Sequence, residues 1–93
     1  MVESGPKTAR LRSLLDELIP LLDESPHWQE WLRKDADDLR DRNARGVRHF
    51  LEAFGGMGSI NDAQWPPSAT RLLSEAYAVA EDIRRNDLDR PAD

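Results

Sequence analysis

Apolar residues recur three and four positions apart near the start of the chain, as they do along one face of an α-helix. This face consists of Leu11, Leu14, Leu15, Leu18, Ile19 and Leu22. The spacing predicts a helix from about Lys7 to Glu24, with charged residues on its other side. Pro20 removes one backbone hydrogen bond from it and lies opposite the leucines, so we expect a kink with the proline facing solvent.

A second helix is predicted to begin in "SPHWQEWL", residues 25–32. Ser25 suits a capping position, and Pro26 suits the first helical position, where no donor is required. The apolar face then continues through Trp28, Trp31, Leu32, Ala36, Leu39, Val47, Phe50, Leu51 and Phe54. Asn43 and Gly46 are weak helix formers. The pattern therefore leaves two alternatives open, a break near residues 43–46 or one long bent helix.

A last helix follows the extended segment "WPPS", and we expect Ser68 to open it. Its apolar face consists of Ala69, Leu72, Leu73, Ala76, Tyr77, Ala80 and Ile83. No segment reads as a convincing strand. The sequence thus predicts an all-α fold, a three- or four-helix bundle with a glycine-rich loop before the last helix. We expect one domain over residues 1–93, with flexible ends at 1–6 and 87–93.

Two features of the predicted core concern particular side chains. We expect one core to contain Trp28, Trp31, Phe50, Phe54, Leu15, Leu18 and Leu73. Asp35 falls inside the apolar face of the second helix, where burial would raise the pKa of its carboxyl unless the group were paired. We expect an arginine of another helix, with Arg71 as a candidate, to neutralise Asp35, or the face to be only half buried there. A catalytic acid is the remaining alternative.

The segment "FGGMGSIND", residues 54–62, contains three of the five glycines. A helix that ends at Phe54 leaves carbonyls without partners, and Gly55 or Gly56 in a left-handed conformation would satisfy them. We therefore interpret the segment as a structural turn. The alternative is an anion-binding nest of backbone N–H groups, and its candidate ligand-binding residues are Gly56, Gly58, Ser59, Asn61 and Asp62.

The stretch "GVRHFLEAFGGMGSIND", residues 46–62, resembles the central motif of a family of small uncharacterised bacterial proteins. In that motif an apolar helix runs into GGMGS, an apolar residue and Asn-Asp. Leucine or valine usually follows the Asn-Asp pair in the family, whereas Ala63, Gln64 and Trp65 follow it here. The resemblance implies common ancestry and brings no known activity with it.

Composition argues against an enzyme. A chain of 93 residues with 39% hydrophobic residues can form one thin core but not a core and a deep substrate cavity. Without cysteine there is no disulfide framework and no thiolate zinc site. His49 and Glu52 form a lone pair three residues apart, and His27 is distant in the sequence, so we predict no metal and no other cofactor.

Charge and hydropathy narrow the choice of partner. Eighteen acidic residues against 13 basic ones give a net charge of −5, which disfavours nucleic acid. No stretch has the length and hydrophobicity of a membrane span or signal peptide, so we expect a cytoplasmic protein. The acidic charge and the arginines and tryptophans at helix surfaces favour a protein that acts by binding a basic protein, as an inhibitor or immunity-type protein does. Association with copies of the same chain, as a homo-oligomer, is a second possibility. The alternative is a small-molecule or anion sensor that uses the glycine loop.

Overall fold

The structure, a computed structural model, describes residues 5–41, 43–54, 59–60 and 64–88. Its α-helices are α1 (Gly5–Leu18), α2 (Pro26–Arg40), α3 (Arg45–Glu52) and α4 (Pro67–Ile83). A 3-10 turn, η1 (Ile19–Leu22), continues α1, and a turn of π-helix, η3 (Arg84–Leu88), continues α4. The described residues contain no strand. The predicted all-α fold is confirmed, and the residues that the structure describes form a bundle of four α-helices.

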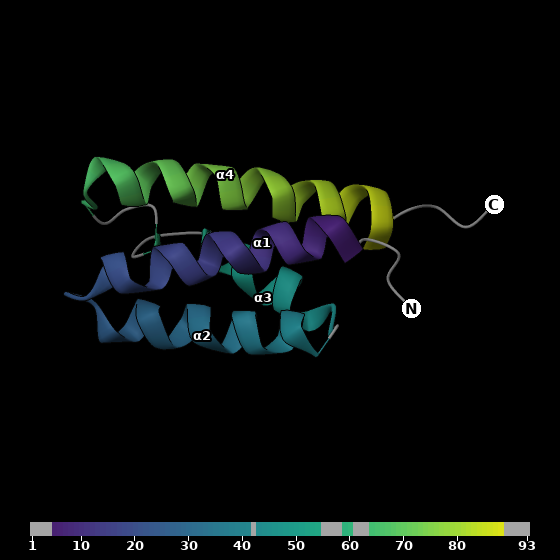
Figure 1. Cartoon of the computed structure of the whole chain (residues 1–93), viewed down its shortest axis with the longest axis horizontal. Coiled ribbons are helices and arrows are strands. Elements are labelled where there is room, and N and C mark those ends of the chain that lie inside the picture. Colours follow the sequence, from purple (N-terminus) through teal and green to yellow (C-terminus); the bar gives the residue numbers. More distant parts are fainter. Residues whose placement is uncertain (1–4, 42, 55–58, 61–63, 89–93) are drawn as a thin grey trace.

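Helix α1 lies between α4 and α2, and α3 packs behind it against both α2 and α4 (Figure 1). The chain runs along α1 in one direction and returns along α2 and α4 in the other (Figure 1). Because α1 has neighbours on two sides, its leucines are the centre of the core. Leu11, Leu15 and Leu18 have no exposed surface.

The predicted kink at Pro20 takes the form of a change in helix type. Helix α1 ends at Leu18, and the chain continues as η1, with Pro20 exposed and Leu22 buried. The proline cannot donate the backbone hydrogen bond that the α-helix would need there. The α-helix is therefore shorter than predicted at its C-terminal end, although the apolar face continues to Leu22.

Between α2 and α3 the chain breaks, which decides between the two alternatives for residues 43–46. The Asn43 N–H donates to the Asp38 carbonyl (2.7 Å), and the Asn43 Oδ1 accepts a hydrogen bond from the Arg45 N–H (3.0 Å). The asparagine side chain thus provides a partner for one of the N–H groups that the start of a helix leaves unsatisfied. This local bond favours a new helix over a continued one.

Two predicted helix starts differ in detail from the structure. Helix α2 begins at Pro26 as predicted, but the Ser25 side chain makes no capping bond, and its carbonyl accepts from the Gln29 N–H (3.0 Å) instead. Helix α4 begins at Pro67, one residue before Ser68. Proline needs no partner for its nitrogen, so it occupies the first helical position.

The predicted core is present as one cluster. Phe50, Leu15 and Leu18 are fully buried, and the rings of Trp28, Trp31 and Phe54 are partly buried against them. Tyr77, which the spacing placed on the apolar face of the last helix, lies at the edge of that face, with 39% of the residue exposed. Its ring contacts Phe54 (centroids 4.8 Å apart), and its hydroxyl donates to Glu81 Oε1 (3.4 Å).

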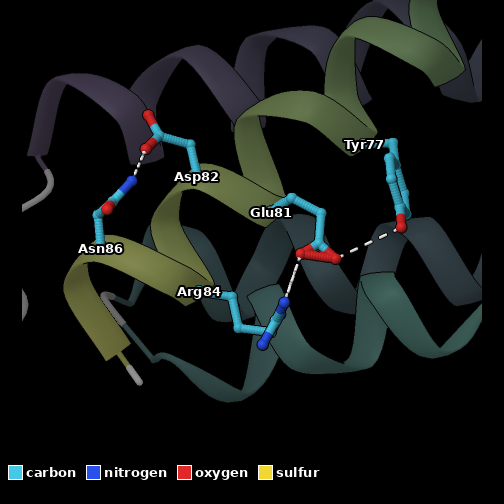
Figure 2. Close-up of polar contacts among 5 residues, drawn as sticks. All are labelled: Tyr77, Glu81, Asp82, Arg84 and Asn86. Carbon is cyan, nitrogen blue, oxygen red and sulfur yellow. Dashed lines mark hydrogen bonds and ion pairs between the residues drawn. The ribbon is translucent and has the colours of Figure 1, made fainter. Parts of the chain in front are cut away.

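Polar contacts join the beginning of α1 to the end of α4. Lys7 Nζ lies 3.3 Å from carboxylate oxygens of both Asp82 and Asp87. Figure 2 shows the neighbouring contacts, in which Asn86 donates to Asp82 and Arg84 donates to Glu81 (2.7 Å). The expectation of flexible ends at 1–6 and 87–93 falls largely outside the described residues and stays a prediction.

Candidate functional site

Helices α2 and α3 are in close contact at Gly46. A Cβ atom placed on Gly46 would lie 2.9 Å from the Asp35 carbonyl oxygen and 2.9 Å from the Cβ atom of Asp38. Both distances are shorter than carbon atoms tolerate, and one neighbour is backbone. The absence of a side chain at this residue therefore allows α3 to pack directly on the C-terminal half of α2.

This close packing places a buried carboxyl group beside a histidine. Asp35 has no exposed surface, and its Oδ1 is hydrogen-bonded to His49 Nδ1. The other oxygen, Oδ2, is buried and has no hydrogen-bond partner among the described residues. The prediction that Arg71 neutralises Asp35 was wrong, and so was the alternative of a half-buried face. Arg71 is exposed on α4, whereas His49 lies directly opposite Asp35 on α3.

Burial changes the acidity of Asp35. Loss of hydration is the largest effect and raises the pKa of its carboxyl to about 7, while the hydrogen bond and the charge of His49 oppose that rise. The carboxylates of Asp38 and Glu52 raise the pKa further. Asp35 therefore exchanges its proton near neutral pH, which is unusual for an aspartic acid.

His49 is also one of four aromatic rings in contact with one another, which we call the aromatic cluster: His27, Trp28, Trp31 and His49. The Trp31 and His49 rings are stacked, with centroids 4.1 Å apart, and Trp31 lies 5.3 Å from Trp28. His27 contacts both tryptophans edge-on, at 4.7 Å and 6.0 Å. His27 is exposed and the other three are only half-buried. Solvent thus reaches a continuous aromatic surface on α2 and α3.

The described residues include one of the five candidate ligand-binding residues of the glycine loop. Gly56, Gly58, Asn61 and Asp62 lie outside the described residues, so both the turn hypothesis and the nest hypothesis stay predictions. Ser59 is described and buried, with 6% exposed. The Ile60 N–H donates to the Ala53 carbonyl (2.8 Å), and Trp65 Nε1 donates to the Ile60 carbonyl (2.7 Å). The first bond attaches Ile60 to the C-terminal end of α3, and the second attaches the Trp65 ring to Ile60.

His49 was not identified from the sequence as the partner of Asp35. It was considered there only as a metal ligand together with Glu52. A signal was present. Asp35 required a partner, and His49 lies one turn of helix after Gly46, the residue at which another helix can come closest. Within the described ranges, no three His, Asp or Glu side chains are grouped as a metal site would require.

No helix in the described part of the chain is long and apolar enough to cross a membrane. The sequence profile of a domain of unknown function, DUF6966, matches residues 22–74. No curated protein and no solved structure matches the chain. The matched residues include α2, α3, the aromatic cluster and the first half of α4. Because the match covers more than half of the chain, the protein belongs to the DUF6966 family.

Proposed function

We propose that this protein acts by binding another protein through the aromatic cluster on α2 and α3. The observation that supports the proposal is the contact of four rings that remain accessible to solvent. Tryptophan is among the residues that contribute most to protein–protein binding, because its large rigid ring excludes water at a low entropic cost.

The indole N–H groups of the two tryptophans differ in a way that fits this role. Trp31 Nε1 donates to the His49 carbonyl (3.1 Å), which fixes its ring against α3. Trp28 Nε1 has no hydrogen-bond partner among the described residues. The cluster therefore combines a rigid half, which needs no reorganisation on binding, with a donor that is available to a partner.

The net charge of −5 supports a basic partner, since long-range attraction raises the rate of association. We propose a role as an inhibitor or immunity-type protein in the cytoplasm, without cofactor or enzymatic activity, and with self-association as a further possibility to measure. We also propose that residues 46–62 carry the characteristic motif of the family and that the family is bacterial. This motif lies within the matched residues 22–74.

Co-purification with matched variants tests the proposal. Tagged wild-type protein, Trp28→Ala and Tyr77→Ala would be expressed in the source organism, purified under native conditions and analysed by mass spectrometry. Tyr77 is the control because it is an exposed aromatic residue on α4, outside the cluster. We expect a partner that accompanies the wild type and Tyr77→Ala and is lost from Trp28→Ala, because a hot-spot truncation costs about 2 kcal/mol or more.

Circular dichroism would establish that both variants are folded before their partners are compared. If folded Trp28→Ala retained every protein that accompanies the wild type, the aromatic cluster would not be the binding surface. Loss of the same partner from both variants would also contradict the proposal, because Tyr77 lies on a different helix.

A further inference from the structure

The accessible part of His49 includes a nitrogen that the fold does not use. Its Nδ1 is hydrogen-bonded to Asp35, while 29% of the His49 side chain is exposed. Within the described part of the chain, Nε2 makes no hydrogen bond. The ring thus connects a buried carboxyl group on one side to the surface of the aromatic cluster on the other.

The burial of Asp35 determines which protons this ring carries. A carboxylate beside a neutral imidazole would place a net negative charge in the core, and Oδ2 would have no donor to stabilise it. Near neutral pH, a pair without net charge avoids that cost. It holds one proton between Asp35 Oδ1 and His49 Nδ1 and a second proton on Nε2, whether Asp35 or His49 keeps the first.

The raised pKa of Asp35 agrees with this assignment, because it reflects the same cost of a buried negative charge. In both forms of the neutral pair, as an ion pair or as two uncharged groups, Nε2 is protonated. His49 therefore presents a hydrogen-bond donor at the surface.

We propose that the Nε2–H group of His49 donates a hydrogen bond to an uncharged acceptor, a backbone carbonyl, of a protein segment bound across the aromatic cluster. Asp35 is a positioning residue in this proposal, since it acts through His49. The proposal rests on the binding function proposed above and names the chemistry that the partner presents there.

Neighbouring charges favour a carbonyl over a carboxylate as the acceptor. Apart from His49, the charges that act most strongly on Asp35 are the carboxylates of Asp38 and Glu52. They lie on α2 and α3, one turn after Asp35 and His49 in the sequence. An incoming carboxylate would be repelled by both, whereas the oxygen of a peptide group carries no net charge.

Stacking fixes the direction of the donor before a partner arrives. The Trp31 ring covers one face of His49 at an interplanar angle of 15°, and Trp31 Nε1 holds the His49 carbonyl. The imidazole cannot rotate without breaking the bond to Asp35. Preorganisation of this kind lowers the entropic cost of binding.

Nitrogen NMR of wild-type protein labelled with ¹⁵N-histidine tests the proton assignment without any variant. At pH 6.5 we expect the resonance of His49 Nε2 to have the chemical shift of a protonated ring nitrogen. An unprotonated Nε2, with the proton only on Nδ1, would overturn the proposal. This measurement involves no partner, so it can fail while the co-purification experiment succeeds.

Two small probes test the acceptor. N-acetylleucinamide is uncharged and has peptide carbonyls, and N-acetylleucine has the same side chain but ends in a carboxylate. We expect N-acetylleucinamide to shift the His49 Nε2 and Trp28 indole resonances with millimolar affinity, about fivefold tighter than N-acetylleucine. Equal or tighter binding of N-acetylleucine, or no saturable shift with either probe, would overturn the proposal.

His49→Phe provides the matched variant, because it retains an aromatic ring on Trp31 and lacks the donor. We expect N-acetylleucinamide binding to fall about fivefold or more in this variant and to stay unchanged in Tyr77→Ala. Should His49→Phe not fold with Asp35 unpartnered, the NMR measurement on the wild type still decides the proposal.

Discussion

The imidazole of His49 lies almost parallel to the indole of Trp31, with ring centroids 4.1 Å apart, and the Trp31 N–H donates to the backbone carbonyl of the same histidine. One residue of α2 thus holds both the side chain and the main chain of a residue 18 positions away. This double contact spans the break between α2 and α3. It restricts how α3 can rotate on α2.

We expect Trp31→Phe to destabilise the protein by about 1 to 2 kcal/mol. Phenylalanine retains a ring over His49 but leaves the half-buried carbonyl of His49 without its donor. Urea denaturation followed by circular dichroism would measure the loss. A free energy of unfolding equal to that of the wild type would show that the hydrogen bond contributes nothing to stability.

The raised pKa of Asp35 predicts a stability that depends on pH. Burial makes the folded protein hold this proton more tightly than the unfolded chain, in which the pKa is about 4. Between about pH 4 and pH 7 the folded state therefore binds more protons, and its free energy of unfolding should fall as the pH rises through that range. The expected fall is about 2 to 4 kcal/mol and should end above pH 7.

Asp35→Asn isolates this effect, because asparagine has the same shape and no charge to lose. The difference in unfolding free energy between wild type and variant should change between pH 4 and pH 7 and be constant above. Parallel pH profiles for the two proteins would show that Asp35 is ionised in the fold as easily as in the unfolded chain.

Gly46→Ala should destabilise the protein by about 1 to 3 kcal/mol, because the new Cβ atom would meet the Asp35 carbonyl and the Asp38 Cβ. Alanine is otherwise the better helix former, so the direction of the change is informative. Gly5→Ala is the matched control, since a Cβ atom there has no neighbour within 4 Å. If both substitutions had the same effect in thermal denaturation, the close helix contact would be absent.

Phe50→Ala should cost about 3 to 5 kcal/mol, because the ring is fully buried and packs edge-on against Phe54 (5.1 Å). Tyr77→Ala, which removes a ring with 39% of the residue exposed, should cost far less. Chemical denaturation of both variants measures the comparison. A loss below about 1 kcal/mol for Phe50→Ala would place that face outside the core.

Helix periodicity predicted the fold well because it reports which face of each helix is buried. The spacing of apolar residues was enough to identify the leucines of α1, the apolar face of α4 and the unusual position of Asp35. It could not identify His49 as the partner of Asp35, because their contact depends on where the chain breaks after α2. That break was one of two open alternatives, and it is stabilised by the side chain of a single residue, Asn43.

The smaller differences between prediction and structure also arise because spacing alone does not describe the chemistry of individual side chains. Periodicity placed Tyr77 on the apolar face of α4, where its ring does contact Phe54. The spacing takes no account of the polar tip of this side chain, which reaches Glu81 at the surface. Serine is a residue type that often caps helices, which is why Ser25 and Ser68 were expected at the helix starts. The adjacent prolines occupy the first helical positions instead, where the missing backbone N–H needs no partner. An arginine was expected as the partner of Asp35, and a histidine was not considered. A histidine can form the hydrogen bond to a buried carboxyl group without carrying the permanent positive charge of an arginine.

The ion pairs between Lys7 and the end of α4 bring the first turn of α1 and η3 to one end of the bundle, while the first turn of α2 lies at the other end (Figure 1). A fluorophore, affinity tag or solid support attached at Gly5 or at Leu88 would thus lie at the end of the bundle opposite to His27 and Trp28. Immobilisation through one end or the other should give the same binding response. The chain could also be reconnected by a short linker there and opened at residues 23–25, between η1 and α2.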